Sequence, residues 1–305
     1  MRILVTGANG MLGSAVVNAY GVSVEVFSIA RQYGDLCNGD NVSRMIADIG
    51  PEVVVHCAAK VGGIHANMSE PDKFFTQNIL MNTHVIHQAC LQGVPRVISF
   101  SSVCAYDQSG LEINEYTHQD GSPHDTNFAY AYAKRMIEIQ MRAYSRRYPT
   151  KLTCIVPTNM YGPNDNFDMK CAHVIPMLIR KCIEAKTTGR MEVWGDGSAE
   201  REFLYAPDLA EIVREVSIME SPPHMLVVSD GRSICMRTVV DTIKSAVGYD
   251  GEISYDSGKP AGQSRRVTDT YLFKSLFPQY MFTPFSSGIR DTVRWYLSSS
   301  GSARE

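Results

Sequence analysis

The chain opens with a strand, a glycine-rich turn and a helix, and this unit limits the possible folds more than any other feature of the sequence. An apolar run from Ile3 to Thr6 leads into the segment GANGMLGSAVVNAYG, which contains Gly7, Gly10 and Gly13. Apolar residues then recur at helical spacing. Glycines at the N-terminus of a helix let a phosphate approach the backbone, where free N–H groups and the helix dipole favour an anion. The unit therefore predicts a dinucleotide site at the start of the chain.

Apolar strands and helices continue to alternate through the first half of the chain. After the opening unit we expect further strands at residues 22–27, 52–59, 96–101 and 151–157, and helices at residues 42–49, 72–92 and 130–148. Strands that are apolar throughout and alternate with helices are typical of a parallel sheet covered on both faces. The predicted fold class is α/β, with a doubly wound parallel (Rossmann) sheet.

The pattern changes after about Tyr161. Loops rich in Gly, Pro, Asn and Asp interrupt short strands and helices there, and such loops often form the walls of binding pockets. Residues 224–231 still have the pattern of a buried strand, so we expect the chain to return to the sheet. The expected division is a dinucleotide-binding domain of residues 1–160 with a return at about 205–232, and a smaller, interleaved C-terminal α/β substrate-binding domain of residues 161–204 and 233–305.

Composition and charge exclude several classes of protein. The 305 residues carry a net charge of -3 without extended basic clusters, which argues against a nucleic-acid partner. No apolar run approaches the roughly 18 residues that a membrane-spanning helix needs. The eight cysteines are scattered without C-x-x-C pairs, and the group His84, His87 and Cys90 lacks a fourth metal ligand. We expect a cytoplasmic protein with reduced thiols, no metal, no membrane contact and no nucleic-acid partner.

The end of the second strand bears on the choice of cofactor. An acidic residue there would bind the ribose 2′-hydroxyl of NAD, but this chain has Ser28 and Arg31 in that region. Arg31 can pair with a 2′-phosphate, which favours NADP(H), although it can also be an ordinary surface arginine. Asp35 and Leu36 follow at positions where they would meet the adenine.

A tyrosine and a lysine share one face of the helix expected at residues 130–148. Tyr130 stands four residues before Lys134, so both side chains project from the same face. A nearby ammonium lowers the pKa of a phenol and so brings it closer to acid–base use at neutral pH. This spacing also arises by chance, but the preceding strand ends near Ser102, whose hydroxyl would meet the phenol. The three residues together predict a Ser–Tyr–Lys oxidoreductase site.

A thiol and an imidazole suggest a second chemical step at the same place. Cys104 follows Ser102 by two residues, and residues two apart on an extended segment point the same way. His173 stands where a loop enters a helix, so its side chain can face the same pocket. A thiol and an imidazole on opposite faces of a substrate carbon form a base and acid pair for epimerisation. Alternatively, Cys104 is a packing residue and His173 a capping or core residue.

Several segments resemble a known family. The glycine-rich turn with Tyr130 and Lys134 resembles the extended short-chain dehydrogenase/reductases, and CAAKVGGIHAN, PTNMYGPNDNF, HVIPML and VWGDGSAEREFLY are similar to the GDP-L-fucose synthases among them. This resemblance implies NADPH-dependent 3,5-epimerisation and 4-reduction of GDP-4-keto-6-deoxy-D-mannose to GDP-L-fucose. It further implies that Ser102 and Tyr130 bind the 4-keto oxygen and that Lys134 holds the phenol and the nicotinamide ribose. Cys104 would be the base and His173 the acid.

The resemblance also implies binding residues and an assembly. The residues expected at the NADP(H) cofactor are Gly7, Asn9, Gly10, Met11, Leu12, Gly13, Arg31, Asp35, Leu36, Ala58, Ala59, Lys60, Lys134, Pro157, Asn159, Met160 and His173. Those expected at the GDP-sugar are Asn159, Lys181, Trp194, Arg201 and Arg266. Helices 72–92 and 130–148 carry apolar residues on more than one face, and the resemblance to dimeric reductases implies a homodimer formed through them.

Two other functions fit parts of the same pattern. The first is a 4-reductase or 4-epimerase that acts on another nucleotide sugar, against which the pair Cys104 and His173 argues. The second is a non-catalytic protein that senses a dinucleotide, which would not need Ser102, Tyr130 and Lys134 together.

Overall fold

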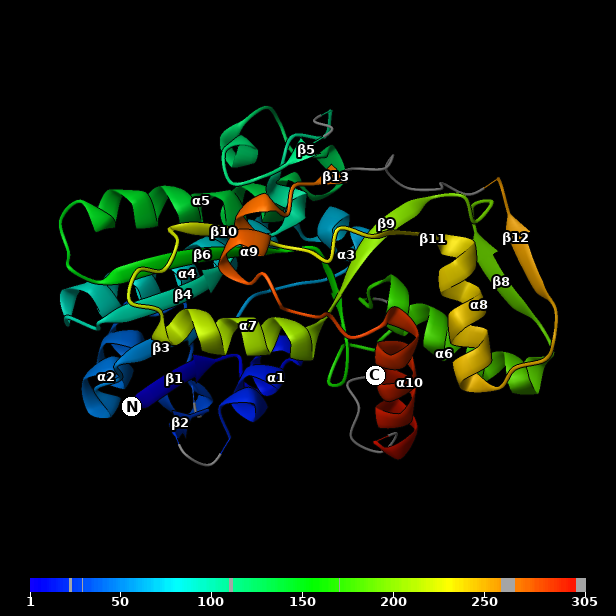
Figure 1. The fold of residues 1–305 in the computed structure, drawn as a ribbon, viewed down its shortest axis with the longest axis horizontal. Helices are drawn as coiled ribbons and strands as arrows, with labels where there is room; N and C mark the ends of the chain where they lie inside the picture. Colours follow the sequence, from blue (N-terminus) through cyan, green and yellow to red (C-terminus); the bar gives the residue numbers. More distant parts are fainter. Residues whose placement is uncertain (22–23, 29, 110–111, 170, 259–266, 300–305) are drawn as a thin grey trace.

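A parallel sheet forms the main body of the molecule. The computed structural model describes residues 1–21, 24–28, 30–109, 112–169, 171–258 and 267–299, without the side chains of residues 30 and 31. Six strands lie in the order β10-β6-β4-β3-β1-β2, and every neighbouring pair is parallel (Figure 1). Their bounds are β1 Arg2–Thr6, β2 Glu25–Phe27, β3 Val53–His56, β4 Arg96–Phe100, β6 Lys151–Pro157 and β10 Met225–Val228. We call this the main sheet, and it confirms the predicted fold class.

Both faces of the main sheet are covered, which explains why its strands are apolar throughout. Along β1, Leu4 faces one core cluster while Ile3 and Val5 face the other. The helices packed into the cluster with Leu4 are α2 (Gly39–Ile49), α4 (Pro71–Leu91) and α5 (Phe128–Ser145). Those packed into the opposite cluster are α1 (Met11–Tyr20), α7 (Ala206–Ile218) and α9 (Tyr271–Leu276).

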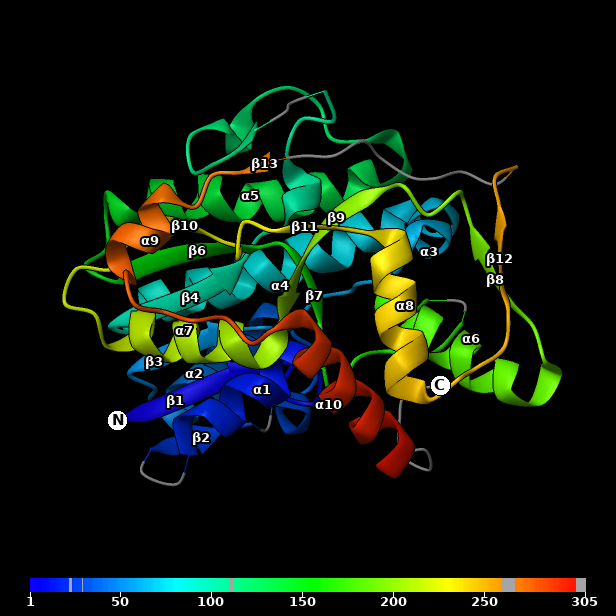
Figure 2. The same ribbon diagram turned by 45° about the vertical axis from the view of Figure 1, so that its right-hand side comes forward.

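A smaller group of elements has its own core and lies beside the main sheet in both ribbon views (Figure 1 and Figure 2). We call it the second unit. Its strands are β7 (Asn159–Tyr161), β9 (Glu200–Tyr205) and β11 (Ser233–Cys235) in one sheet, with β8 (Met191–Trp194) and β12 (Ile253–Asp256) as a separate parallel pair. Its helices are α6 (Val174–Thr188), α8 (Met236–Val247) and α10 (Phe285–Ser298). Because β7 begins two residues after β6 ends, the second unit starts at the carboxyl edge of the main sheet.

The chain passes between the main sheet and the second unit several times. It first returns to the main sheet through α7 and β10. Arg96 of β4 holds α7 there, because its guanidinium caps the end of the helix by donating to the Val216 carbonyl at 2.7 Å. The chain returns again through β13 (Val267–Thr268), which pairs with β5 (Glu112–Ile113), and through α9. The short elements are α3 (Ile64–Ser69) and the 3₁₀ helices η2 (Ala30–Tyr33), η3 (Val103–Ala105), η4 (Thr117–Gln119) and η5 (Asp125–Asn127).

Most expected elements lie close to their predicted bounds, and side-chain caps explain one of the shifts. The strand expected at 151–157 is β6 itself, while the helix expected at 42–49 begins earlier, at Gly39. The Asn38 side chain caps that helix by accepting from the Asp40 N–H at 2.8 Å. None of the helices in the described ranges is both long and apolar enough to cross a membrane.

Candidate active site

The candidate site lies at the carboxyl edge of the main sheet. The chain order of the strands reverses between β1 and β3, and doubly wound sheets bind ligands outside the carboxyl ends of strands at such a point. The segments that leave β1, β3 and β4 at this edge carry the glycine-rich turn, residues 57–60 and Ser102.

The glycine-rich turn is packed so closely that two of its glycines cannot carry a side chain. Gly7 has a φ of 68°, and a Cβ there would lie 2.7 Å from the backbone nitrogen of Ala58. A Cβ on Gly13 would lie 2.2 Å from the Gly7 carbonyl oxygen. Gly10 caps α1 and donates its own N–H to Gly7 at 2.9 Å. The first-turn N–H groups of α1 have no partner within the helix, so they suit a phosphate.

A buried chain of hydrogen bonds holds β3 against this turn. The Thr6 hydroxyl lies 2.7 Å from His56 Nδ1, and His56 Nε2 lies 3.1 Å from the Asn82 side-chain oxygen. Burial and the charge of Lys134 lower the pKa of His56 to about 3, so the imidazole is neutral and donates to Asn82. Thr6 then donates to His56 and accepts from the Ala58 N–H at 3.2 Å. These hydrogen bonds fix Ala58 beside the glycine-rich turn. The sequence alone predicts His56 only as a residue of a buried strand.

The segment after β4 differs from its prediction. The sequence predicts an extended stretch from Ser102 to Cys104, but residues 103–105 form the 3₁₀ helix η3. The Ser102 hydroxyl caps it by accepting the Cys104 N–H at 3.2 Å. The extended prediction is wrong because a serine side chain can bond the backbone two residues on and so turn the chain. Both side chains still lie near the phenol of Tyr130, since Ser102 shares a hydrogen bond with it and Cys104 influences its pKa electrostatically.

The phenol of Tyr130 is held in its protonated form. Burial raises its pKa well above the usual value of about 10, and the nearby Cys104 thiol raises it further. A hydrogen bond with Ser102 opposes this rise. The sequence predicts a pKa lowered by the Lys134 ammonium, and the net direction is the reverse because burial dominates.

Lys134 lies on the same face of α5 and points into the sheet. Its ammonium is 5.8 Å from the centre of the Tyr130 ring, and Nζ donates to the Phe100 carbonyl at 2.9 Å. The side chain is 5% exposed, and this burial lowers its pKa to about 8, opposed by Cys154 and Cys57. Lys134 therefore connects the end of β4 with the helix that carries the phenol.

The loop after β3 approaches Tyr130 through an aromatic ring. Phe74 of α4 meets the Tyr130 ring edge-on, with centroids 6.4 Å apart, and the Lys60 ammonium lies 5.0 Å from the Phe74 ring centre. The buried Asn78 side chain holds Lys60 by accepting its N–H at 3.0 Å and donating to its carbonyl at 2.9 Å. Sequence reasoning missed Phe74 and Asn78, because their distance from the site along the chain hides the contact.

His173 lies where the second unit meets this loop. It occupies the N-cap position of α6, is exposed and makes no capping hydrogen bond with its side chain. The N–H of Gly63 donates to the Cys171 carbonyl at 3.0 Å, which joins the loop after β3 to the turn before His173. The alignment of His173 with Cys104 across a substrate carbon stays a prediction.

The expected substrate residues of the second unit fall into two groups. On α6 and β8, Lys181 lies 5.7 Å from the ring centre of Trp194, which is 59% exposed. On β7 and β9, the Asn159 amide donates to the Glu202 carbonyl at 2.9 Å, and Arg201 donates to the Glu200 carbonyl at 2.6 Å.

The remaining expected residues differ in exposure. Leu36 packs into the core and is 8% exposed, whereas Asp35 is exposed and accepts from the Cys37 N–H at 2.9 Å. Arg266 and the side chain of Arg31 lie outside the described residues. Other expected cofactor residues on the described loops and elements at this edge are Asn9, Met11, Leu12, Ala59, Pro157 and Met160.

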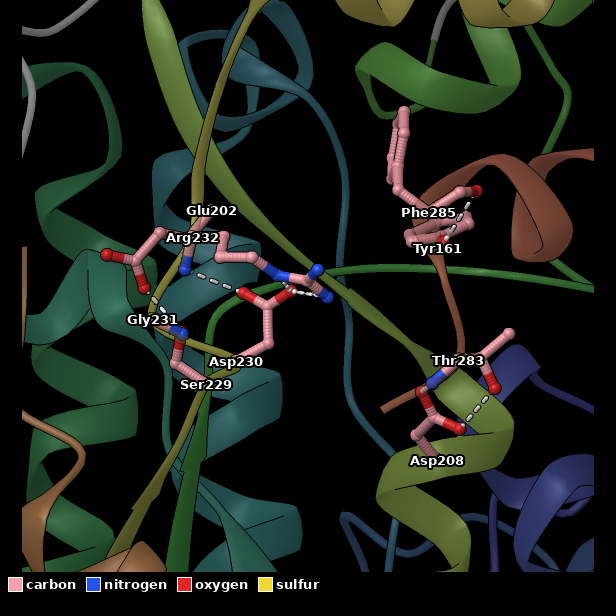
Figure 3. A network of polar contacts seen from close by, with 9 residues as sticks. All are labelled: Tyr161, Glu202, Asp208, Ser229, Asp230, Gly231, Arg232, Thr283 and Phe285. Carbon is pink, nitrogen blue, oxygen red and sulfur yellow. Dashed lines mark hydrogen bonds and ion pairs between the residues drawn. The ribbon is translucent and has the colours of Figure 1, made fainter. Parts of the chain in front are cut away.

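Polar contacts join the second unit to the main sheet beside this site (Figure 3). The buried Glu202 carboxylate of β9 accepts from the Ser229 hydroxyl, at the end of β10, and from the Thr268 N–H at 3.2 Å. On α7, the Asp208 carboxylate accepts from the N–H and hydroxyl of Thr283 at 2.9 and 2.7 Å. These contacts set the position of β7 and β9, and hence of Asn159.

Comparison with known proteins agrees with this geometry. Residues 3–226 match the model of the NAD dependent epimerase/dehydratase family. The chain is 34% identical to a GDP-L-fucose synthase of Dictyostelium discoideum over 99% of its own length and 97% of the relative's. It is 31% identical to the GDP-L-fucose synthase of Escherichia coli (strain K12), over 98% and 97% of the two lengths. A crystal structure of a GDP-L-fucose synthetase from Naegleria fowleri bound to NADP superposes with a TM-score of 0.94 at 32% identity, covering 100% of this chain and 95% of that one. The chain therefore belongs to the NAD dependent epimerase/dehydratase family, in which it matches GDP-L-fucose synthases over nearly its whole length.

Proposed function

We propose that this protein is an NADPH-dependent enzyme that epimerises GDP-4-keto-6-deoxy-D-mannose at C3 and C5 and reduces it at C4 to GDP-L-fucose. The observation that carries the proposal is that Ser102 and Cys104 both lie near the Tyr130 phenol, on the helix that carries the buried Lys134. A reduction alone needs only the hydroxyl, the phenol and the ammonium, whereas the added thiol supplies a base for epimerisation. The full-length similarity to GDP-L-fucose synthases supports the same assignment.

The glycine-rich turn fits a dinucleotide. Gly7 lets the turn lie against Ala58, Gly13 lets α1 lie close to the turn, and the first N–H groups of α1 are beside it. Bound NADPH would supply the hydride for C4. Lys134 would hold the nicotinamide ribose, and Arg31 would pair with the 2′-phosphate. Asp35 and Leu36 are the proposed contacts of the adenine.

In the reduction, Tyr130 would donate its proton to the 4-keto oxygen. The raised pKa of the phenol suits this role, because the group must be protonated when negative charge develops on the oxygen. Ser102 would donate a second hydrogen bond to the same oxygen. Both groups would act on one atom and so must lie side by side, and the hydrogen bond between Ser102 and the Tyr130 phenol of α5 supports this role.

In the epimerisations, Cys104 would remove a proton from C3 or C5 and His173 would return one from the opposite face. The 4-ketone acidifies both positions, so a single carbonyl serves both epimerisations before it accepts the hydride. The exposed position of His173 at the N-cap of α6 would let its imidazole reach a sugar held between the main sheet and the second unit. Asn159, Lys181, Trp194, Arg201 and Arg266 are the proposed contacts of the GDP-sugar.

We also propose the setting in which the enzyme works. Residues 1–160 with the return at about 205–232 would bind the dinucleotide, and residues 161–204 and 233–305 the sugar nucleotide. The protein would be a cytoplasmic homodimer joined through α4 and α5, whose exposed apolar side chains include Phe75 and Met136.

The test is incubation of the protein with NADPH and GDP-4-keto-6-deoxy-D-mannose in deuterium oxide, with the product identified by NMR. The expected product is GDP-L-fucose with deuterium at C3 and C5. A reduced sugar with the original hydrogens and configuration at C3 and C5 would assign the protein to the simple 4-reductases instead.

A further inference from the structure

The 3₁₀ helix that carries Cys104 is closed at both ends by side chains. At its start, the Ser102 hydroxyl accepts the Cys104 N–H, and the Ser102 carbonyl accepts the Ala105 N–H at 2.9 Å. At its end, the Ala105 carbonyl accepts from both Nε and Nη2 of Arg135, with the Nε contact at 2.9 Å. Ala105 and Tyr106 are buried while Cys104 is partly exposed, so the closed turn directs the thiol outward.

Arg135 is a buried arginine whose hydrogen bonds all go to backbone carbonyls, while its guanidinium lies 5.4 Å from the ring centre of Tyr132. Its side chain is 4% exposed and also donates to the Asp120 carbonyl at 3.1 Å and to the Gly121 carbonyl at 2.9 Å. Among the ion pairs of the described residues, none contains Arg135. A guanidinium is costly to bury, and here the cost is offset by four hydrogen bonds to two separate segments. It follows that Arg135 ties the Cys104 turn to the segment at Asp120 and Gly121.

The position of Arg135 on α5 links this brace to the reduction machinery. It directly follows Lys134, whose ammonium holds the Phe100 carbonyl at the other end of the same chain segment. The helix α5 therefore holds the segment that follows β4 at both ends, at the Phe100 carbonyl through Lys134 and at the Ala105 carbonyl through Arg135. Cys104 lies between these two anchors.

We infer that Arg135 is a positioning residue for the epimerisation steps, which holds the Cys104 thiol in line with the protons at C3 and C5. The inference rests on the proposed function. It separates two tasks on one helix, since Tyr130 and Lys134 would serve hydride transfer whereas Arg135 would serve proton abstraction through the turn it holds. A shift of about 1 Å in a reacting group can cost roughly 10²-fold in rate.

The discriminating variant is Arg135→Lys, which keeps the charge. An ammonium has three donors, but all are on one nitrogen, whereas Arg135 reaches the Ala105 carbonyl and the carbonyls of Asp120 and Gly121 from three separate nitrogens. A lysine is therefore expected to lose the contact with one of the two segments. The matched control is Arg142→Lys on the same helix, where the exposed Arg142 pairs with Glu138 at 3.2 Å. Deuterium exchange at C3 and C5 is measured by NMR, with NADPH affinity recorded alongside as a check on folding.

The same substitution in the Cys104→Ser background isolates the other step. The Cys104→Ser protein lacks the thiol, so the rate measured for it is that of direct reduction of the unepimerised ketone. A residue that acts only through Cys104 should not change this rate. We expect Arg135→Lys to slow exchange by about 10²-fold in the natural background. We expect the rate of reduction by the Cys104→Ser protein to change by less than about twofold when Arg135→Lys is added. We expect Arg142→Lys to change neither the exchange rate nor the reduction rate.

Two results would overturn the inference. Exchange at the natural rate in Arg135→Lys would show that the turn does not need its brace. Equal losses in exchange and in reduction by the Cys104→Ser protein would show that Arg135 supports the whole site. A failure of the proposed function looks different, because the unaltered protein would then exchange no deuterium, and the inference would fall with it.

Discussion

Tyr130 and His118 illustrate how burial sets protonation at the scale of single residues. Burial raises the pKa of the Tyr130 phenol and keeps its proton in place, whereas burial lowers the pKa of His118 to about 4 and keeps the imidazole neutral. For His118, the charge of Arg135 acts in the same direction and that of Glu138 opposes it. At neutral pH the phenol of Tyr130 is thereby protonated, and the imidazole of His118 is a hydrogen-bond partner without charge.

Replacing the phenol tests its role directly. Tyr130→Phe removes the proton donor while leaving the ring that packs against Phe74. We expect reduction at C4 to fall by about 10²- to 10⁴-fold, the usual contribution of a positioned acid, with NADPH affinity nearly unchanged. Single-turnover oxidation of NADPH provides the rate. The control is Tyr132→Phe, two residues along the helix, which should reduce the ketone at the natural rate. Reduction at the natural rate by Tyr130→Phe would show that the phenol is not the proton donor.

His118 makes stability depend on pH. Its imidazole is 1% exposed and lies 2.7 Å from the Ser101 hydroxyl, so the folded protein resists protonation until about pH 4. The unfolded chain takes up that proton below about pH 6.5. Stability is therefore full above about pH 6.5 and is lost as the pH falls from there towards 4. From pH 7 to pH 5 this one group should lower the free energy of unfolding by about 2 kcal/mol.

Urea unfolding at the two pH values measures the effect. In His118→Gln, which keeps a polar side chain without a titration, the decrease between pH 7 and pH 5 should be smaller by that amount. An equal decrease in both proteins would mean that other groups account for the acid sensitivity.

At the scale of elements, α5 is the organising piece of the site. Tyr130, Lys134 and Arg135 on this helix contact, respectively, the residues of the Cys104 turn, the end of β4 and the Ala105 carbonyl. The helix itself is predictable from the sequence, since its apolar spacing follows from packing on the sheet. The turn is not, because a side-chain cap and a guanidinium stabilise it, and neither appears in the alternation of apolar and polar residues.

The same distinction holds for contacts between elements. Strands such as β6 are predictable because burial on both faces requires an unbroken apolar run. The contact of Gly63 with Cys171 joins residues far apart in the chain, and the contact of Phe74 with Tyr130 depends on how α4 packs against α5. Such pairings follow from the completed fold, so residue patterns within one segment carry no sign of them.

The glycine-rich turn gives a prediction at this scale. In Gly13→Ala the new Cβ would meet the Gly7 carbonyl at 2.2 Å, so α1 must move away from the turn. We expect a loss of about 1–3 kcal/mol in the free energy of unfolding, together with weaker NADPH binding, measured by urea unfolding and fluorescence titration. Gly10→Ala places its Cβ at 3.2 Å from the same oxygen and should cost clearly less. Equal effects would mean that close packing of the turn is not the reason for the glycines.

At the scale of the whole molecule, α4 and α5 pack side by side and keep apolar side chains on their outer faces. Phe75 is 42% exposed and Met136 is 37% exposed, although both helices already cover the main sheet. A second chain that packs its own pair of helices against these faces would remove them from water.

Sedimentation should therefore show a dimer at micromolar concentration. We expect Met136→Glu to dissociate it, because the substitution places a charge in the apolar contact. Leu297→Glu, on the exposed side of α10, should leave the dimer intact. A monomeric natural protein, or a dimer that Met136→Glu does not weaken, would contradict the proposed interface.

The repeated passage of the chain between the main sheet and the second unit has a thermodynamic consequence. The stretch from β7 to β9 leaves the sheet at the end of β6 and rejoins it at α7, so both of its ends are anchored. A loop with anchored ends has fewer conformations open to it than a free chain of equal length, and it loses less entropy when it folds. The main sheet thus stabilises the second unit through the connections of the chain as well as through contacts. Loops of the second unit that are rich in glycine and asparagine can therefore surround a sugar with a smaller loss of conformational entropy.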